Sequence, residues 1–308
     1  MAQANIPDGV WPVMLTPFNE DKMIDWDGVD ALTDWYIEAG VSGLFAVAQS
    51  SEMYALSDLE RLKLAYRVVE RADGRVPVVA TGTFGGSIEQ QADSVRRMAD
   101  TGVQAVITIT SQLAAQSEEE DVWRAKTETL LDLTENISLG LYECPAPYKR
   151  LLSPDALRWA AQTGRFVFHK DTCLSLREIT AKIAAIVGTP LKFFNAEISS
   201  LSDSLSIGGN GFSGVAANFY PEHLVWLCEH WAEAEASELQ YFLSVAEMVI
   251  DHKYPSSAKY FLRETRSAEI STICRVPDQL LTEHDRRTII HLAECLKTLD
   301  FPVLHGKG

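Results

Sequence analysis

The chain has 308 residues, of which 46% are hydrophobic and 23% charged, a composition typical of a folded globular protein rather than a disordered one. Its 27 basic and 43 acidic side chains give a formal net charge of −16, which disfavours binding to nucleic-acid phosphates or anionic membrane surfaces. No apolar run reaches the roughly 20 residues of a transmembrane helix, and no secretory signal is visible. Five scattered cysteines form no CxxC pair, so we expect reduced thiols and a cytoplasmic protein.

Helical and strand-like segments alternate along the chain. Amphipathic helices are predicted over 25–40, 87–102 and 153–164, and each ends at a glycine suited to the left-handed C-terminal cap. A short β-rich apolar run follows each of them. The strands expected, in chain order, are Val10–Thr16, 41–49, Val76–Gly82, 103–110, Ile137–Cys144, 165–170, Leu191–Glu197 and a last one near Gly211–Ala217.

This alternation predicts parallel strands joined by helical crossovers. Eight such units within about 220 residues favour a closed (β/α)8 TIM barrel, an α/β fold. An open doubly wound sheet is the alternative, but no GxGxxG follows the first strand. Beyond Tyr220 only helices are expected, at Pro221–Asp251, Ser256–Thr265 and Thr282–Leu299. We therefore assign residues 1–235 to a barrel with the active site and 236–308 to a C-terminal helical extension.

Lys170 is the strongest candidate for a chemical role. Catalytic groups of such barrels stand at the carboxyl ends of the strands, whereas most other lysines here fall on helices or near the termini. Strand alternation places Lys170 on one face with Phe166 and Phe168, and turns His169 toward the helix layer. An amine among apolar side chains loses its proton more easily and can condense with a carbonyl. The alternative is a rim lysine paired with Asp171 or another carboxylate.

Two further strand ends carry candidate polar groups. Tyr142 ends the strand ISLGLY, where alternation turns it inward, so its hydroxyl can donate and accept a proton. A core tyrosine with a satisfied hydroxyl is the alternative. The loop after the second strand offers Ser50, Ser51 and backbone N–H groups that can hold a carboxylate, unless it is an ordinary polar loop. The glycine-rich stretch Gly208–Gly214 either holds phosphate or forms a tight turn.

No metal site is predicted from the sequence. The seven histidines are scattered, without an HExxH motif or paired spacing. Cys144 and Cys173 lie just beyond Tyr142 and Lys170, but no base that would activate a cysteine nucleophile is evident. No GxSxG motif is present either.

Taken together and in order, these motifs resemble the dihydrodipicolinate synthase/N-acetylneuraminate lyase family of class I, Schiff-base-forming pyruvate aldolases. GVWPVMLTPF is similar to the family's opening strand, and AVAQSSEMYALSDLER resembles its GTTGE…LS..ER loop. YECP resembles its YNxP, KDT its KDS/KDT, and GGNGFSGVAANFYPE its GxxGxxS…N segment. The collinear set spans nearly the whole chain.

The resemblance implies an enzyme that acts on a 2-oxo acid without a metal or organic cofactor. Lys170 would form the imine, and Tyr142 would be the acid/base. The imine would stabilise the carbanion left when C3–C4 breaks, or the one formed when C3 loses a proton before water leaves. Ser50 and Ser51 would grip the carboxylate. The substrate-binding residues implied are Gln49, Ser50, Ser51, Phe212 and Ser213. The family's usual tetramer implies a homo-oligomer, either tetramer or dimer.

Three departures from the family pattern bear on the reaction. Gln49 replaces the first Thr of the loop, whose hydroxyl belongs to a proton relay with the active-site Tyr. The relay's second Tyr, which a neighbouring subunit contributes in the family, should fall near Leu113, where this sequence has no Tyr. Glu143 replaces the Asn of YNxP and adds a carboxylate beside Tyr142.

The sequence supports one leading function and two alternatives. Dihydrodipicolinate synthase activity itself is disfavoured, because the Arg that holds aspartate semialdehyde is missing near Pro147, with only Lys149 and Arg150 close by. We expect a lyase that cleaves a 2-oxo acid by retro-aldol reaction, or dehydrates a 2-keto-3-deoxy sugar acid or related compound. A catalytically weak relative that binds a 2-oxo or sugar acid without turnover is the second hypothesis. Phosphate-sugar binding at Gly208–Gly214 is the third.

Overall fold

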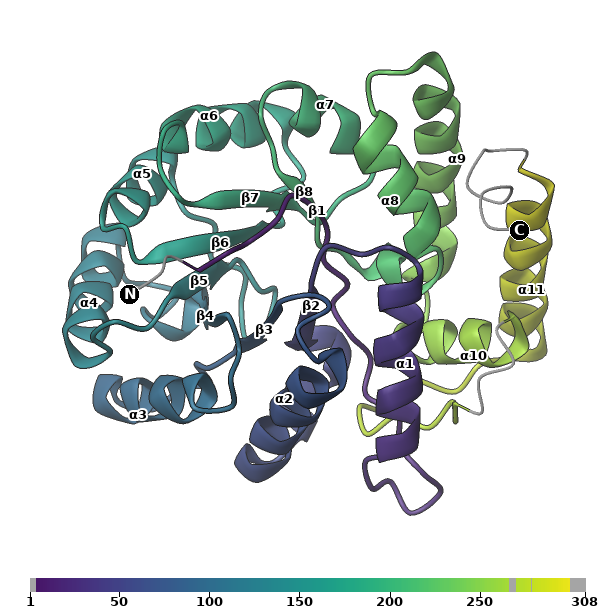
Figure 1. Cartoon of the computed structure of the whole chain (residues 1–308), viewed down its shortest axis with the longest axis horizontal. Helices are drawn as coiled ribbons and strands as arrows, with labels where there is room; N and C mark the ends of the chain where they lie inside the picture. The colour runs from purple at the N-terminus through teal and green to yellow at the C-terminus, as the bar shows by residue number, and fades with distance from the viewer. Residues whose placement is uncertain (1–3, 266–269, 278, 300–308) are drawn as a thin grey trace.

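The computed structural model describes residues 4–265, 270–277 and 279–299. Eight parallel strands form one sheet in the order β1-β8-β7-β6-β5-β4-β3-β2, and helices surround it (Figure 1). The strands are β1 (Gly9–Val10), β2 (Leu44–Val47), β3 (Val78–Thr81), β4 (Ala105–Ile109), β5 (Leu139–Tyr142), β6 (Phe166–Asp171), β7 (Lys192–Asn195) and β8 (Gly211–Phe212). The predicted (β/α)8 barrel is confirmed.

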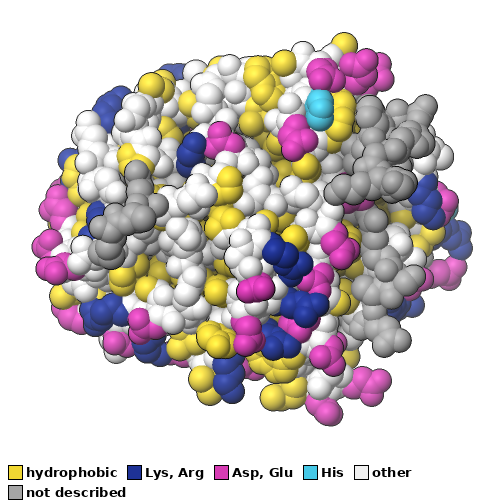
Figure 2. Space-filling model, in the orientation of Figure 1, with side chains coloured by type: hydrophobic (Ala, Val, Ile, Leu, Met, Phe, Trp, Pro, Cys, Tyr) yellow, Lys and Arg dark blue, Asp and Glu magenta, His cyan; other side chains and the backbone are white. Residues whose placement is uncertain are grey.

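Helices follow the strands and then continue into the predicted C-terminal extension. They are α1 (Trp26–Glu38), α2 (Asp58–Ala72), α3 (Ile88–Ala99), α4 (Glu120–Leu133), α5 (Pro154–Gln162), α6 (Leu176–Ile186), α7 (Leu201–Ser206), α8 (Pro221–His230), α9 (Ala234–Ile250), α10 (Ser256–Thr265) and α11 (Glu283–Thr298). None of the helices in the described ranges is long and apolar enough to cross a membrane. Acidic and basic side chains are interspersed over the face shown in Figure 2, so the net negative charge is not gathered there into one patch.

The single helix predicted over Pro221–Asp251 is in fact two helices, α8 and α9. The backbone leaves the helical conformation at Glu233, whose N–H donates to the carbonyl of His230 at 2.8 Å. No proline or glycine marks this turn, and the apolar pattern runs on through it, so the sequence gives no sign of the break. The turn lets α9 pack back against α8. The boundary that we propose at residue 235 falls at the start of α9.

The barrel closes where β1 meets β8 on one side and β2 on the other. Gly9 and Gly211 are register partners, and a β-carbon added at Gly211 would lie 1.9 Å from the Gly9 carbonyl oxygen. Only glycine fits such an approach. The segment after β1 reaches β2 through a parallel bridge between Val13 and Phe45. Within the stretch Gly208–Gly214, at least Gly211 is therefore required for the barrel to close.

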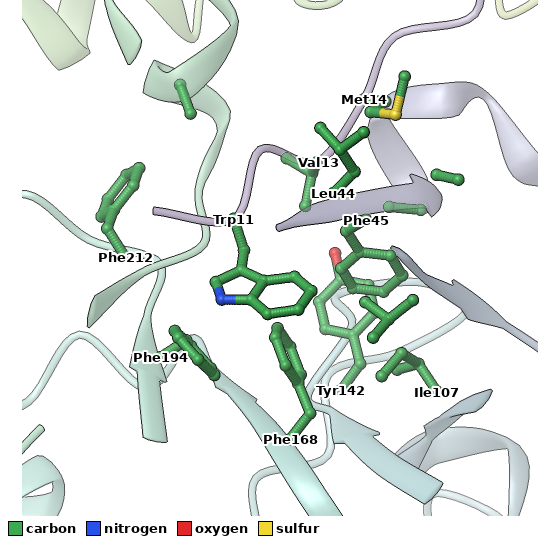
Figure 3. Packing of buried hydrophobic residues seen from close by; sticks show 14 of the residues in the cluster. Trp11, Val13, Met14, Leu44, Phe45, Ile107, Tyr142, Phe168, Phe194 and Phe212 are labelled. Carbon is green, nitrogen blue, oxygen red and sulfur yellow. The ribbon is translucent and has the colours of Figure 1, made fainter. Parts of the chain in front are cut away.

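Aromatic rings fill the barrel below its carboxyl end. Trp11 contacts Phe168 edge to face, with ring centroids 5.3 Å apart, and Phe168 stacks on Phe194 at 4.4 Å. Phe45 contacts both Phe168 and Tyr142 (Figure 3). The rings of this layer are buried and closely packed, so any polar group directly above it has apolar neighbours on one side.

A buried ionic cluster lies on the other side of β5 and β6, toward α6. The Lys182 ammonium of α6 donates to a carboxylate oxygen of Glu143 and to one of Asp171, each at 2.6 Å. All three side chains are at most 1% exposed. Burial alone would lower the pKa of Lys182, but the two carboxylates raise it above its usual value. The His169 imidazole lies beside both carboxylates, as strand alternation predicts.

The C-terminal extension docks on the loop that follows β2. The buried Lys259 ammonium of α10 donates to Glu52 at 2.7 Å. The other oxygen of that carboxylate accepts the backbone N–H groups of Arg275 and Val276, at 2.5 and 2.9 Å. The Arg275 guanidinium also pairs with Glu60, at the start of α2. One loop of the barrel thus anchors two separate segments of the extension.

We predict that Lys182→Met lowers the free energy of unfolding by about 3–5 kcal/mol, because it leaves two buried carboxylates without a counter-charge. Urea unfolding followed by circular dichroism measures the loss. Lys126→Met is the matched control, since the Lys126–Glu118 pair is partly exposed and should contribute less than about 1 kcal/mol. Adding Glu143→Gln to Lys182→Met should restore part of the stability. Equal losses in the two lysine variants would contradict the role of the cluster.

Candidate active site

A cavity of about 480 Å³ opens at the carboxyl ends of the strands. Four of the seven residues predicted for the site line it: Gln49, Ser50, Tyr142 and Lys170. Its wall also includes residues of the extension, among them Glu247, Asp251, Tyr254, Pro255, Val276 and Gln279. The extension therefore completes the cavity that the barrel begins.

Lys170 projects into this cavity from β6 and is 3% exposed. Its ammonium nitrogen lies 5.0 Å from the centre of the Tyr142 ring, and no side chain or carbonyl of the described residues accepts a hydrogen bond from it. Asp171 points to the opposite face, where it pairs with Lys182. Burial lowers the pKa of Lys170 to about 7, so a large share of the amine is neutral near pH 7.

Tyr142 lies beside Lys170 because their strands are in register at these two residues. Its ring rests against Phe45 of the aromatic layer, at 5.8 Å between centroids. Burial raises the pKa of Tyr142 well above its usual value, so the hydroxyl keeps its proton over the whole physiological range. A protonated phenol next to a neutral amine can supply and recover a proton without being ionised at rest.

The predicted loop residues lie in the short 3₁₀ turn Gln49–Ser51, where Ser50 and Ser51 make different contacts. Ser50 lines the cavity and hydrogen-bonds with the Tyr254 hydroxyl. The Ser51 hydroxyl lies outside the cavity, 2.7 Å from the Met14 carbonyl oxygen, and it accepts the Ala48 N–H at 3.1 Å. Ser51 therefore fixes the loop against the segment that follows β1, and it is not part of the cavity wall.

Phe212 and Ser213 do not reach the cavity wall, unlike the two residues that follow them. Phe212 is fully buried in β8 at the edge of the aromatic layer (Figure 3). Ser213 is fully buried too, and its hydroxyl has no hydrogen-bond partner within the described part of the chain. Gly214 and Val215 line the cavity instead. Period-2 alternation fixes neither position, because β8 is only two residues long.

Tyr254 lines the cavity although sequence reasoning missed it, and Cys144, which the sequence places just beyond Tyr142, is not part of the cavity wall. The Tyr254 hydroxyl accepts the Asn218 side-chain N–H at 2.7 Å, and Tyr254 follows α9, where no motif marks it. The buried Cys144 thiol donates to the Gln49 side-chain oxygen at 3.4 Å and hydrogen-bonds with the Tyr142 hydroxyl. Leu113, near which the family's relay Tyr would fall, is buried.

Glu143, His169 and Asp171 are the one group of side chains in the described ranges whose spacing suits a metal ion, with ligand atoms within 4.8 Å of one another. The Lys182 ammonium lies between the two carboxylates and already donates to both. A cation that belongs to the chain thus fills the space. The arrangement fits a structural ion cluster better than a metal centre.

Comparison with known proteins identifies the family. A model of the dihydrodipicolinate synthetase family matches residues 6–295. A 4-hydroxy-tetrahydrodipicolinate synthase of Methanococcus maripaludis (strain C6) is 31% identical over 245 residues, which cover 76% of this chain and 80% of the relative. Another, from Gluconacetobacter diazotrophicus, is 25% identical over 280 residues, or 90% and 92% of the two chains.

Solved structures of similar proteins have the same fold. A prophage protein of the dihydrodipicolinic acid synthase family from E. coli K12, in complex with pyruvate, matches with a TM-score of 0.84 at 24% identity, over 94% of this chain and 98% of its own. The pyruvate complex of the dihydrodipicolinate synthase from Acinetobacter baumannii matches with a TM-score of 0.84 at 21% identity, over 94% and 98%. The chain therefore belongs to the dihydrodipicolinate synthetase family and is a lyase of the class I, Schiff-base-forming aldolase type.

Proposed function

We propose that the protein cleaves or dehydrates a 2-oxo acid, such as a 2-keto-3-deoxy sugar acid, through an imine on Lys170, with Tyr142 as the acid/base. The observation that carries this proposal is the buried amine of Lys170. It has no hydrogen-bond partner among the described residues, lines the cavity, and lies 5.0 Å from the Tyr142 ring. A buried amine without a hydrogen-bond partner can act as a nucleophile and attack a carbonyl carbon. The pyruvate complexes of two family members support a 2-oxo acid as the ligand.

In the first step, the neutral amine of Lys170 attacks the C2 carbonyl of the 2-oxo acid. Tyr142 protonates the carbonyl oxygen as the carbinolamine forms, and water leaves to give the protonated imine. The hydroxyl of Ser50 is the loop group available for the substrate carboxylate. Ser51 is less suited to that role, because its hydroxyl already bonds to the backbone of the loop and of the segment that follows β1.

In the second step, the protonated imine accepts an electron pair. For aldol cleavage, Tyr142 takes the proton of the C4 hydroxyl, the C3–C4 bond breaks, and its electron pair forms an enamine while an aldehyde leaves. For dehydration, Tyr142 takes the C3 proton to give the enamine and then returns a proton to the C4 hydroxyl, which leaves as water. After aldol cleavage, Tyr142 instead gives the proton it took from the C4 hydroxyl to C3 of the enamine, which restores the protonated imine. Water then adds to the imine in either route, and its hydrolysis frees Lys170. Both routes use the same residues, and the substrate determines which bond breaks.

A binding-only relative is the second candidate, and one feature favours it. Gln49 presents an amide where a hydroxyl would pass a proton, and its oxygen accepts a hydrogen bond from Cys144 instead. Binding without turnover predicts no reduced adduct and no exchange of substrate protons. The three experiments below separate the two functions.

Borohydride reduction in the presence of pyruvate should attach one reduced pyruvate to the protein, and peptide mapping should find it on Lys170. Lys170→Ala should abolish the adduct, because no other lysine of the described chain is both buried in the cavity and free of hydrogen bonds. Lys63→Ala, an exposed lysine on α2, is the control and should label fully. Labelling of Lys170→Ala at the normal level would move the nucleophile elsewhere.

Tyr142→Phe should slow deuterium exchange at the C3 methyl group of pyruvate by about 10²–10⁴-fold, because the imine then lacks its acid/base. Proton NMR in D₂O measures this exchange without knowledge of the natural substrate. Tyr241→Phe, on the exposed face of α9, should exchange at the wild-type rate. Exchange by Tyr142→Phe within a few-fold of wild type would remove Tyr142 from the mechanism.

Imine formation should rise with pH through a midpoint near 7 and level off about one unit above it. Only the neutral amine attacks a carbonyl, and burial lowers the pKa of Lys170 to about 7, so the reactive fraction grows as pH passes that value. Tyr142 stays protonated throughout, since its pKa moves in the opposite direction. The initial rate of pyruvate trapping between pH 5.5 and 9 gives the midpoint. A midpoint near 10, typical of an exposed lysine, would show that the amine is not desolvated.

A further inference from the structure

A chain of hydrogen bonds behind the cavity wall ends at the Ser50 hydroxyl. Its centre is Asn218, which ends the 3₁₀ turn after β8 and is fully buried. The side-chain amide of Asn218 contacts groups from three separate parts of the chain: the Tyr36 hydroxyl of α1, the Val13 carbonyl after β1 and the Tyr254 hydroxyl after α9. The amide therefore ties the barrel to the extension at the point where Tyr254 enters the cavity wall.

The Asn218 amide fits these surroundings in one orientation only. The Val13 carbonyl oxygen can accept a hydrogen bond but not donate one, so the amide nitrogen must face it, at 3.0 Å. The second N–H of that nitrogen donates to the Tyr254 hydroxyl at 2.7 Å. The amide oxygen accepts the O–H of Tyr36, which is also fully buried. The Tyr254 oxygen is therefore an acceptor in its contact with Asn218.

The direction of this hydrogen bond determines how Tyr254 meets Ser50. Both residues line the cavity, and their hydroxyls hydrogen-bond with each other. A phenol that already accepts one hydrogen bond has its own proton left to donate, and Ser50 is the hydroxyl within reach. The Ser50 hydroxyl has no other hydrogen-bond partner in the described ranges. Its own proton is thus left to point into the cavity.

We propose that Tyr254 is a positioning residue, which holds the Ser50 hydroxyl as a hydrogen-bond donor toward the carboxylate of the bound 2-oxo acid. A carboxylate only accepts hydrogen bonds, so Ser50 binds it only when the serine proton points into the cavity. A hydroxyl that accepts the Tyr254 proton is fixed in this state before the ligand arrives and loses less rotational freedom on binding. The inference rests on the proposed function, because it requires a 2-oxo acid at Lys170 whose carboxylate reaches Ser50.

Borohydride trapping at increasing ligand concentration measures the effect of Tyr254 with two probes, pyruvate and its uncharged amide, pyruvamide. Tyr254→Phe keeps the ring and removes the hydroxyl. It should raise the half-saturating pyruvate concentration about 5- to 10-fold, while the adduct formed at saturation stays within about 2-fold. Half-saturation by pyruvamide should change by less than about 2-fold, because a neutral acceptor gains less from an oriented donor. Tyr241→Phe, on the exposed face of α9, is the matched control and should leave both values unchanged. An equal shift with both probes would overturn the proposal.

A double-variant cycle tests whether Tyr254 acts through Ser50. Ser50→Ala should raise the half-saturating pyruvate concentration about 10- to 100-fold. Adding Tyr254→Phe should then change that value by less than about 2-fold, because the group that Tyr254 orients is gone. Lys149 lines the same cavity and attracts any anion, so Tyr254→Phe should keep its full effect in a Lys149→Met background.

Two outcomes of the cycle would contradict the proposal. Effects of Tyr254→Phe and Ser50→Ala that multiply would show that the Tyr254 hydroxyl binds the ligand itself. Normal half-saturation in Ser50→Ala would show that Ser50 does not hold the carboxylate. Failure of pyruvate to label the wild-type protein is a different result, because it refutes the proposed function itself.

Discussion

The site depends on a charge pairing that takes place behind it. Glu143 and Asp171 each follow a residue that faces the cavity, Tyr142 in one strand and Lys170 in the next. The Lys182 ammonium joins the two carboxylates across the outer face of β5 and β6. Because neighbouring residues of a strand point to opposite faces, this bridge holds both strand ends and keeps Asp171 away from Lys170. The amine is thereby left without a counter-charge on the side that faces the cavity.

The separation of Asp171 from Lys170 explains how the amine of Lys170 can lose its proton easily in a strongly acidic chain. Lys170 lies above the aromatic layer of Trp11, Phe168 and Phe194, and the nearest carboxylates are already neutralised by Lys182. Desolvation then outweighs attraction, and the pKa of Lys170 falls. Had Asp171 faced the cavity, an ion pair would hold the ammonium form and suppress nucleophilic attack. Local geometry, and not net charge, therefore determines the pKa of this lysine.

Residues that a short-range pattern governs could be predicted from the sequence, and those set by packing between distant segments could not. Alternation in β6 put Lys170 in the barrel and His169 outside it, and the structure agrees. The Ser51 hydroxyl was predicted to bind the substrate carboxylate, but it donates to the Met14 carbonyl, a contact between the turn after β2 and the segment after β1 that no local pattern reveals. Tyr254 lies outside every motif, because its position depends on how the extension folds back over the barrel.

The extension is thus part of the site, although the chain enters it only after the barrel is complete. Glu52 directs two of its segments, through Lys259 on one side and the backbone of Arg275 on the other, onto the loop that carries Ser50. The barrel supplies Lys170 and Tyr142, whereas the extension supplies Glu247 and the outer wall of the cavity. A substitution in the extension can therefore reshape the cavity while Lys170 and Tyr142 stay in register on β6 and β5.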